Sequence, residues 1–484
     1  MNRCLHNAVA KRWKCMKRLE LMPTNENILI SLKEDIFERN QDLGYFIQLL
    51  DSIEGPYSIA VNGSWGSGKT FFVKQAKMIL DAYNLDFNMT DENRDKIKSL
   101  IRFSQNPIKS QYCIYYDAWK NDCNLDPIYS LICSITAGYE YFNDRGSENK
   151  KKVIEAGISV IQNMIPFIPN SAVRTMLSIL PLDKMKDALE KTNPLSNVKE
   201  HIKLEEKIQG FLQNLSSEKE ERLVVFVDEL DRCRPDFAVQ LLERIKHYFD
   251  LENITFVFSV NCEQLIQTIK KFYGEDFDAG RYLGRFFDQV IPLPQAELPN
   301  YFTKLNIESS VFFDCTIRKF IQIKNLSLRD IIRIANVENV IKKHMTSRNL
   351  WFSSSNQDTD YFVSHCVIPL LIEINALEPQ HYSRFINGEN VEEFITFMKE
   401  NDYSVRIQEA LRDRQNDEII ERDESFEGGL RAIYIALFNK NYEQENVYVG
   451  KYIFTPNMRQ YLKEASSLLS QSSDFNYDVK SEKK

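Results

Sequence analysis

The stretch Gly63-Ser64-Trp65-Gly66-Ser67-Gly68-Lys69-Thr70 decides the fold of this chain. It follows the apolar run 57–61, which has the character of a buried strand, and it precedes residues 70–83, whose apolar residues recur at helical spacing. A strand, a glycine-rich loop and a helix are the context in which G-x-x-x-x-G-K-[ST] forms a phosphate-binding loop, or P-loop. A flexible turn is the alternative, but the position between strand and helix favours phosphate binding.

Each residue type in this loop has a physical role. Glycines let the backbone curl so that successive N–H groups point at a phosphate, and the N-terminus of the next helix adds to their attraction. Lys69 would span the β- and γ-phosphates of a nucleotide, and Thr70 would present its hydroxyl to Mg²⁺. The residues that we expect around the nucleotide are Gly63, Ser64, Trp65, Gly66, Ser67, Gly68, Lys69 and Thr70.

Two acids follow a second apolar run, at 223–227. Asp228 stands where a carboxylate can hold the water shell of Mg²⁺, and Glu229 would be the catalytic base. Adjacent side chains at a strand end point in different directions, so one acid can face the metal and the other the water. The alternative is a solvated acidic turn in which Asp231 pairs with Arg232.

Asn261 ends the next apolar run, at 254–260. Many P-loop ATPases place a polar residue at this height that senses the γ-phosphate, and we assign Asn261 to that position. A strand-terminal Asn that caps the turn before Glu263 explains the residue equally well. Both interpretations stay open.

The order of the segments predicts an α/β fold. Strands are expected at 57–61, 112–117, 223–227 and 254–260, and a helix at 235–250 joins the last two, as in a right-handed crossover. This order predicts a P-loop NTPase core with a central, mainly parallel sheet. Beyond Pro292 and Pro294 the pattern is helical, including 328–343 and 360–375.

We divide the chain into four parts on these patterns. They are an N-terminal extension at 1–27, a P-loop NTPase domain at 28–345 with a helical insertion at about 145–220, a helical C-terminal region at 346–465, and a flexible tail at 466–484.

Composition limits the function classes. Lys and Arg total 61 against 69 Asp and Glu, a formal net charge of −8, so net charge does not support nucleic-acid binding. The nine cysteines include no C-x-x-C pair, which suits a reducing compartment. Residues 1–18 are basic but lack the apolar run of a signal peptide, and no membrane span is predicted. We therefore expect a cytoplasmic protein.

The stretch 224–233, V-V-F-V-D-E-L-D-R-C, resembles the signature of the KAP family of P-loop NTPases. Further segments resemble that family in the same order, over roughly residues 30–340. They are the Trp-containing loop 63–70, Y-Y-D-A-W-K at 115–120, F-V-F-S-V-N at 256–261, Y-L-G-R-F-F-D at 282–288 with I-P-L-P at 291–294, and L-R-D-I-I-R at 328–333.

The resemblance implies an additional-strand ATPase core that uses ATP and Mg²⁺. Many relatives carry membrane helices between the two nucleotide motifs, and bacterial relatives include phage-exclusion and phage-defence ATPases. Because such spans are missing here, the chain resembles a soluble bacterial member. It departs from the family pattern at Glu229, where Asp is frequent, at Asp117, where Asn is frequent, and at Asn261, where Asp is common.

Three arginines are candidates for neutralising charge that develops on phosphate, because a guanidinium matches phosphate oxygens with two prongs. They are Arg285, Arg329 and Arg333, of which Arg329 is the preferred catalytic residue. Surface ion pairing is the alternative for all three.

The leading hypothesis is an ATP-hydrolysing switch or motor with a role in bacterial anti-phage defence. The sequence has no N-K-x-D segment that reads guanine, which favours adenine. A nucleotide-binding regulatory scaffold with negligible turnover and a small-molecule kinase are the alternatives. An unknown protein partner, such as one encoded alongside it, and a homo-oligomer both remain open.

Overall fold

The computed structural model describes residues 21–101, 108–122, 127–142, 148–164, 197–216, 222–305, 307, 312–347, 356–401, 403–413, 420, 423–442, 444–460 and 462. The chain divides into two compact units, one of residues Met22–Asn300 and one that contains Tyr301–Lys484 with Met1–Leu21. Three predicted segments lie wholly or partly outside the described residues. They are the tail at 466–484, most of the extension at 1–27 and the middle of the insertion at about 145–220.

A parallel five-stranded sheet forms the centre of the first unit. Its strands are β1 (Tyr57–Asn62), β2 (Gln111–Asp117), β3 (Arg222–Asp228), β4 (Ile254–Val260) and β5 (Gln289–Pro292), in the order β2-β3-β4-β1-β5. All four predicted strands are confirmed, and β4 lies between β1 and β3 as the additional-strand arrangement requires. The predicted α/β P-loop fold is therefore confirmed.

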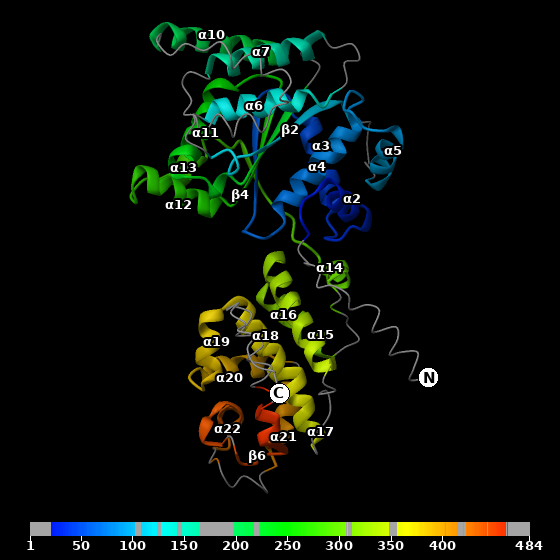
Figure 1. Cartoon of the computed structure of the whole chain (residues 1–484), viewed down its shortest axis with the longest axis vertical. Coiled ribbons are helices and arrows are strands. Elements are labelled where there is room, and N and C mark those ends of the chain that lie inside the picture. The colour runs from blue at the N-terminus through cyan, green and yellow to red at the C-terminus, as the bar shows by residue number, and fades with distance from the viewer. Residues whose placement is uncertain are drawn as a thin grey trace, which may run out of the picture. The chain divides into compact units, whose positions relative to one another are not determined.

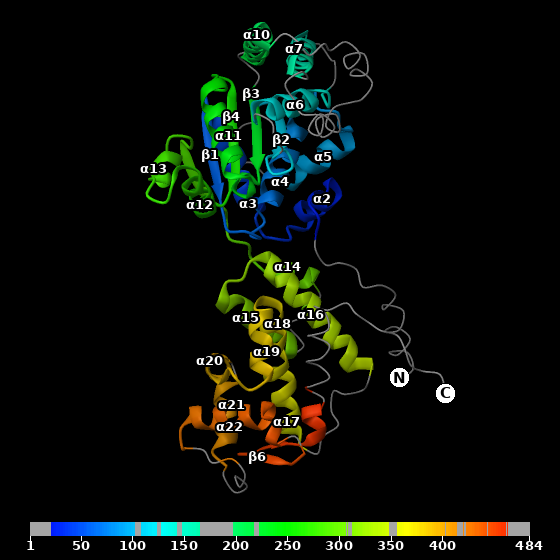
Figure 2. The same cartoon turned by 60° about the vertical axis from the view of Figure 1, so that its left-hand side comes forward.

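The direction of winding decides which helices cover which face. From β1 the chain crosses to the far strand β2 through α4 (Lys69–Tyr83) and α5 (Asp91–Leu100), and it then returns through β3 and β4 to β5. Right-handed crossovers in opposite directions must lie on opposite faces of the sheet. Figures 1 and 2 accordingly show α4 on one side of the strands and α12 (Cys262–Tyr273) on the other.

Alternation along β3 matches this layering. Leu223, Val225 and Val227 belong to one hydrophobic core together with residues of the helices on the α12 side, whereas Val224 and Phe226 point to the other face. The direction of winding reverses beside β1. In such sheets ligands bind at the carboxyl ends of the strands next to this point of reversal.

The other helices of this unit pack around the sheet. They are α2 (Asn25–Glu34), α3 (Asn40–Ser52), α6 (Pro127–Tyr139), α7 (Glu148–Met164), α10 (Asn197–Ser216), α11 (Pro235–Tyr248) and α13 (Ala279–Leu283), with a 3-10 turn at Leu230–Arg232. Helices α7 and α10, which fall in the predicted insertion, lie side by side (Figure 1).

Apolar residues recur at helical spacing from Ile28 to Leu50, but this segment does not form one continuous helix. The chain breaks between α2 and α3, where Asp35 and Glu38 adopt left-handed backbone conformations with φ of 43° and 51°. The Asp35 carboxylate accepts hydrogen bonds from the N–H groups of Arg39 at 3.0 Å and Asn40 at 3.2 Å, at the start of α3. Local side-chain capping therefore outweighs the apolar periodicity at this point.

The second unit is mainly helical, as the sequence predicts for this part of the chain. Its helices are α15 (Phe312–Lys324), α16 (Leu328–Ser347), α17 (Gln357–Phe362), a π turn (Val363–Val367), α18 (Ile368–Leu377), α19 (Pro379–Ile386), α20 (Val391–Glu400), α21 (Ser404–Leu411) and α22 (Phe426–Phe438), and α14 spans Pro299–Lys304. A short antiparallel hairpin of β6 (Val447–Val449) and β7 (Tyr452–Phe454) was not expected from the sequence.

One helix among the described residues, Gln357–Leu377, is long and apolar enough to cross a membrane by length and composition. It carries Asp358, Asp360 and Glu373, and 61% of its apolar window is buried inside the protein. This burial is what a core helix of the second unit requires.

The turn of the β6–β7 hairpin generates a testable prediction. Gly450 has a φ of 60°, and a β-carbon there would lie 2.3 Å from the Ala410 carbonyl oxygen. We expect Gly450→Ala to lower the free energy of unfolding by about 1–3 kcal/mol, measured by urea denaturation, because it adds both a clash and backbone strain. Gly210→Ala is the control, since a β-carbon there meets nothing within 4 Å inside α10 and should not destabilise the helix. Equal effects of the two substitutions would contradict this account.

Candidate functional site

The loop between β1 and α4 is shaped to surround an anion. Gly66 and Gly68 have φ of 79° and 93°, which a side chain would strain, and α4 begins directly afterwards at Lys69. A β-carbon on Gly63 would lie 2.9 Å from the Ser67 hydroxyl, so the loop closes tightly on itself. This geometry fits the backbone cradle that holds phosphate at a helix N-terminus.

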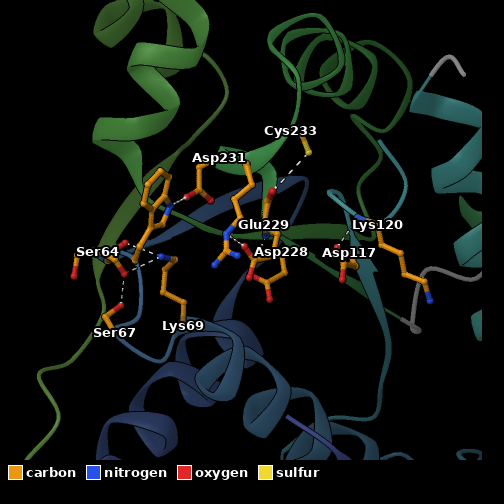
Figure 3. Close-up of polar contacts among 12 residues, drawn as sticks. Ser64, Ser67, Lys69, Asp117, Lys120, Asp228, Glu229, Asp231 and Cys233 are labelled. Carbon is orange, nitrogen blue, oxygen red and sulfur yellow. Dashed lines mark hydrogen bonds and ion pairs between the residues drawn. The ribbon is translucent and has the colours of Figure 1, made fainter. Parts of the chain in front are cut away.

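Lys69 bends back over the loop. Its Nζ donates to the Gly63 carbonyl at 2.7 Å and to the Ser64 carbonyl at 3.1 Å. Burial lowers the pKa of Lys69, and the charges of Asp231, Asp228 and Glu229 act to raise it. The acids that follow β3 are therefore near enough to act on the ammonium, and Figure 3 shows Lys69, Asp228 and Glu229 close together at one edge of the sheet.

Asp228 is fixed at the end of β3 with 1% of its surface exposed. The Tyr115 hydroxyl donates to its Oδ2 at 2.8 Å, and the Glu229 backbone N–H donates to its Oδ1 at 3.0 Å. Burial raises the pKa of Tyr115, with a further contribution from Asp228, so the phenol stays protonated and able to donate. In the strand register Asp228 lies between Asp117 and Ser259.

Glu229 adopts a left-handed backbone conformation with φ of 62°, where the chain turns into the 3-10 turn. Its carboxylate forms an ion pair with Arg232, three residues on. Burial raises the pKa of Glu229 to about 7, the Asp228 charge adds to this rise, and Arg232 acts against it. A carboxyl group with this pKa can exchange a proton near neutral pH.

A magnesium site of the P-loop kind needs few protein ligands. Among the described residues no group of three or more His, Cys, Asp or Glu side chains is placed to hold a metal ion. Mg²⁺ in P-loop proteins is instead held by the loop hydroxyl, an acid at a strand end, water and phosphate oxygens. Thr70, in the first turn of α4, and the buried Asp228 are the residues that could provide the protein ligands of such a site.

Asn261 caps helix α12. Its side-chain oxygen accepts from the N–H groups of Glu263 at 3.1 Å and Gln264 at 3.2 Å, which is the capping arrangement that the sequence left as an alternative. A sensing role for its amide stays a prediction. The Asn62 side chain, which the sequence did not single out, accepts from the Cys262 N–H at 2.9 Å and so ties the end of β1 to the same helix.

The three predicted arginines are all exposed. Arg285 follows α13 in the first unit, whereas Arg329 and Arg333 belong to α16 in the second unit. Arg333 pairs with Asp330 at 3.2 Å, as the ion-pair alternative expects, and a catalytic role for Arg329 stays a prediction. Arg232 lies beside the acids: it pairs with Glu229, and its guanidinium carbon lies 5.5 Å from the centroid of the Trp119 ring.

Arg39 is a contact of the phosphate loop that sequence reasoning missed. It is 4% exposed, and its guanidinium donates to the Ser67 carbonyl at 3.1 Å. Its Nε has no hydrogen-bond partner among the described residues, and burial lowers the pKa of Arg39 to about 10. No motif marks this residue, and its position before α3 becomes meaningful only when α3 packs on α4.

Comparison with known families agrees with this geometry. A family model described as the KAP family P-loop domain matches residues 44–387, more than two thirds of the chain. The matched segment contains the phosphate loop, the acidic pair and all five strands of the parallel sheet. A comparison with curated proteins finds no match.

The support of Asp228 by Tyr115 generates a second prediction. Tyr115→Phe removes a donor from a carboxylate that is almost fully buried, so we expect the free energy of unfolding to fall by about 1–3 kcal/mol in urea denaturation. Tyr112→Phe, on the same strand, is the matched control, because its hydroxyl makes a longer bond of 3.2 Å to the less buried Asp86. A loss in Tyr112→Phe as large as that in Tyr115→Phe would show that Asp228 does not depend on this hydroxyl.

Proposed function

This chain belongs to the KAP family of P-loop NTPases, and from that premise we propose that it binds ATP with Mg²⁺ and hydrolyses it as a switch or motor. One observation carries the proposal. Lys69 at the start of α4 lies beside Asp228 and Glu229 at the end of β3. A phosphate-binding cation and a metal-side acid pair at one sheet edge are what phosphoryl transfer from a nucleotide needs.

Phosphate binding would use the backbone N–H groups of the loop and the Lys69 ammonium. The N–H groups of the loop and of the first turn of α4 would donate to the β-phosphate, and Lys69 would exchange the Gly63 and Ser64 carbonyls for β- and γ-phosphate oxygens. Since burial disfavours the lysine charge, the phosphate charge compensates for this cost. The family resemblance and the lack of a guanine-reading segment favour ATP.

The metal side would be held by Thr70 and Asp228. When bound, Mg²⁺ neutralises negative charge on the phosphates. Tyr115 and the Glu229 backbone N–H keep the Asp228 carboxylate in one orientation, so little reorganisation is needed for it to hold the ion's water shell.

Glu229 would accept the proton of the attacking water. A pKa of about 7 suits a general base at neutral pH, but its carboxylate is paired with Arg232 and must turn away from that partner to reach water. Hydrolysis would therefore wait on the opening of this pair, which suits a switch with slow basal turnover. The same pair also favours the second candidate, a nucleotide-binding scaffold that scarcely hydrolyses.

The biological setting is proposed from the family resemblance. We propose a cytoplasmic protein that acts in bacterial anti-phage defence, alone as a homo-oligomer or with a protein partner encoded alongside it. Plaque formation on cells that carry the wild-type chain or Glu229→Gln tests this role. If protection is lost in Glu229→Gln, defence depends on hydrolysis. Equal plaque counts on cells with the wild-type chain, with Glu229→Gln and with neither chain would contradict the proposed role.

The third prediction separates the candidate functions. We expect Lys69→Ala to abolish Mg·ATP binding, whereas Glu229→Gln keeps binding and lowers ATP turnover by about 10²-fold or more, because it removes the base but keeps the side-chain shape. Turnover is measured as phosphate release and affinity by calorimetry. Glu263→Gln is the control, since this exposed acid follows the neighbouring strand β4 and should leave both quantities unchanged.

The alternative functions give different results in the same assay. A scaffold binds Mg·ATP with turnover that is unaffected by Glu229→Gln. A small-molecule kinase releases little phosphate until an acceptor is added, and the label of the γ-phosphate then appears on that acceptor. Failure of the wild-type chain to bind any nucleoside triphosphate would refute the proposed function as a whole.

A further inference from the structure

One side-chain hydrogen bond joins the phosphate loop to the loop that follows β3. The Trp65 indole Nε1 donates to Asp231 Oδ2 at 2.6 Å, across 166 positions of sequence. An indole N–H can only donate and a carboxylate can only accept, so the two groups match in one direction. The bond is short because its acceptor is charged.

The sheet order leaves a gap between the two loops, and this bond spans it. Strands β1 and β3 are not neighbours, because β4 lies between them. The loops that leave β1 and β3 therefore start about 10 Å apart, twice the spacing of adjacent strands, and no backbone ladder runs directly from one to the other. The Trp65–Asp231 pair spans this gap with side chains.

The burial of Asp231 indicates that its hydrogen bond with Trp65 is a specific contact and not a chance contact at the surface. Asp231 is 5% exposed, and its Oδ1 has no hydrogen-bond partner in the described part of the chain. A buried carboxylate is costly unless it is compensated, and the compensation comes from the indole and from the Lys69 charge. Among the acids that act on Lys69, Asp231 has the largest influence.

The backbone explains how Asp231 reaches the loop. The left-handed turn at Glu229 leads into the 3-10 turn Leu230–Arg232, which sends the Asp231 side chain to Trp65 and the Arg232 side chain to Glu229 and Trp119. The neighbouring residues Asp231 and Arg232 therefore contact opposite sides of the site. Trp65 keeps 45% of its surface exposed, so core packing alone does not fix its indole.

We propose that Asp231 is a positioning residue that fastens the phosphate loop to the metal-side loop through Trp65, and thereby sets the gap that Mg·ATP must bridge. The inference rests on the proposed function and deepens it. Mg·ATP touches both loops, whereas a ligand that touches only the phosphate loop gains little from their spacing. Loss of the pair should therefore weaken Mg·ATP more than inorganic phosphate.

The test uses the full-length chain and three substitutions. Trp65→Phe removes the donor and keeps a ring, Asp231→Leu removes the acceptor, and Asp231→Asn removes the charge but keeps an oxygen that the indole can reach. Asp236→Leu and Asp236→Asn are the matched controls at an exposed acid in the first turn of α11. Calorimetry measures the Kd of Mg·ATP and of phosphate, and thermal unfolding shows that each variant folds.

We expect Trp65→Phe and Asp231→Leu each to raise the Kd of Mg·ATP about tenfold, the double variant to do no more than either alone, and Asp231→Asn to stay within about threefold of the wild type. The Asp236 controls should bind normally. If Asp231→Leu does not fold, Trp65→Phe compared with Asp231→Asn carries the test.

Three results would overturn the inference while leaving the proposed function intact. They are normal Mg·ATP binding by Trp65→Phe, penalties that add in the double variant, and an Asp231→Asn defect as large as that of Asp231→Leu. A purely structural bond would lower the unfolding midpoint and leave the Kd unchanged, which also counts against positioning. If the wild-type chain binds no Mg·ATP, the proposed function fails and this inference fails with it.

Discussion

The placement of β4 between the strand that carries the phosphate loop and the strand that carries the acids is the constraint on which the site depends. Each loop is tied to this middle strand. The Gly63 N–H donates to the Val260 carbonyl at 3.1 Å, and Asp228 lies in register with Ser259. The rigidity of three paired, largely buried strands therefore passes directly to the groups that would bind a nucleotide and its metal.

Burial makes this site electrostatically costly. Desolvation lowers the pKa of Lys69 and raises the pKa of Glu229, so each group resists its own charge. Ion pairing between Glu229 and Arg232 and hydrogen bonds to Asp228 offset part of that cost. A polyanion with a divalent cation would complete the compensation, which gives the chain a physical reason to bind both together.

The sequence could predict what depends on short-range pattern. The four central strands, the phosphate loop and the acids after β3 each have a local signal, and the structure brings the loop and the acids together. Other features depend on capping or on packing between distant segments. They are the break at Asp35, the short strands β5, β6 and β7, and the contact of Arg39 with Ser67. The partner of Arg232 is a similar case, because Asp231 and Glu229 are both near it in sequence and only the left-handed turn selects Glu229.

The half-exposed indole on the phosphate loop also makes the protein observable. Trp65 is a native fluorophore whose N–H contacts a carboxylate, and the emission of an indole responds to nearby charge and to water. A rearrangement of the phosphate loop would change both the distance of the indole from the Asp231 carboxylate and its contact with water. The arrival and departure of a ligand could thus be followed in real time by ultraviolet emission, without a dye or a modified nucleotide.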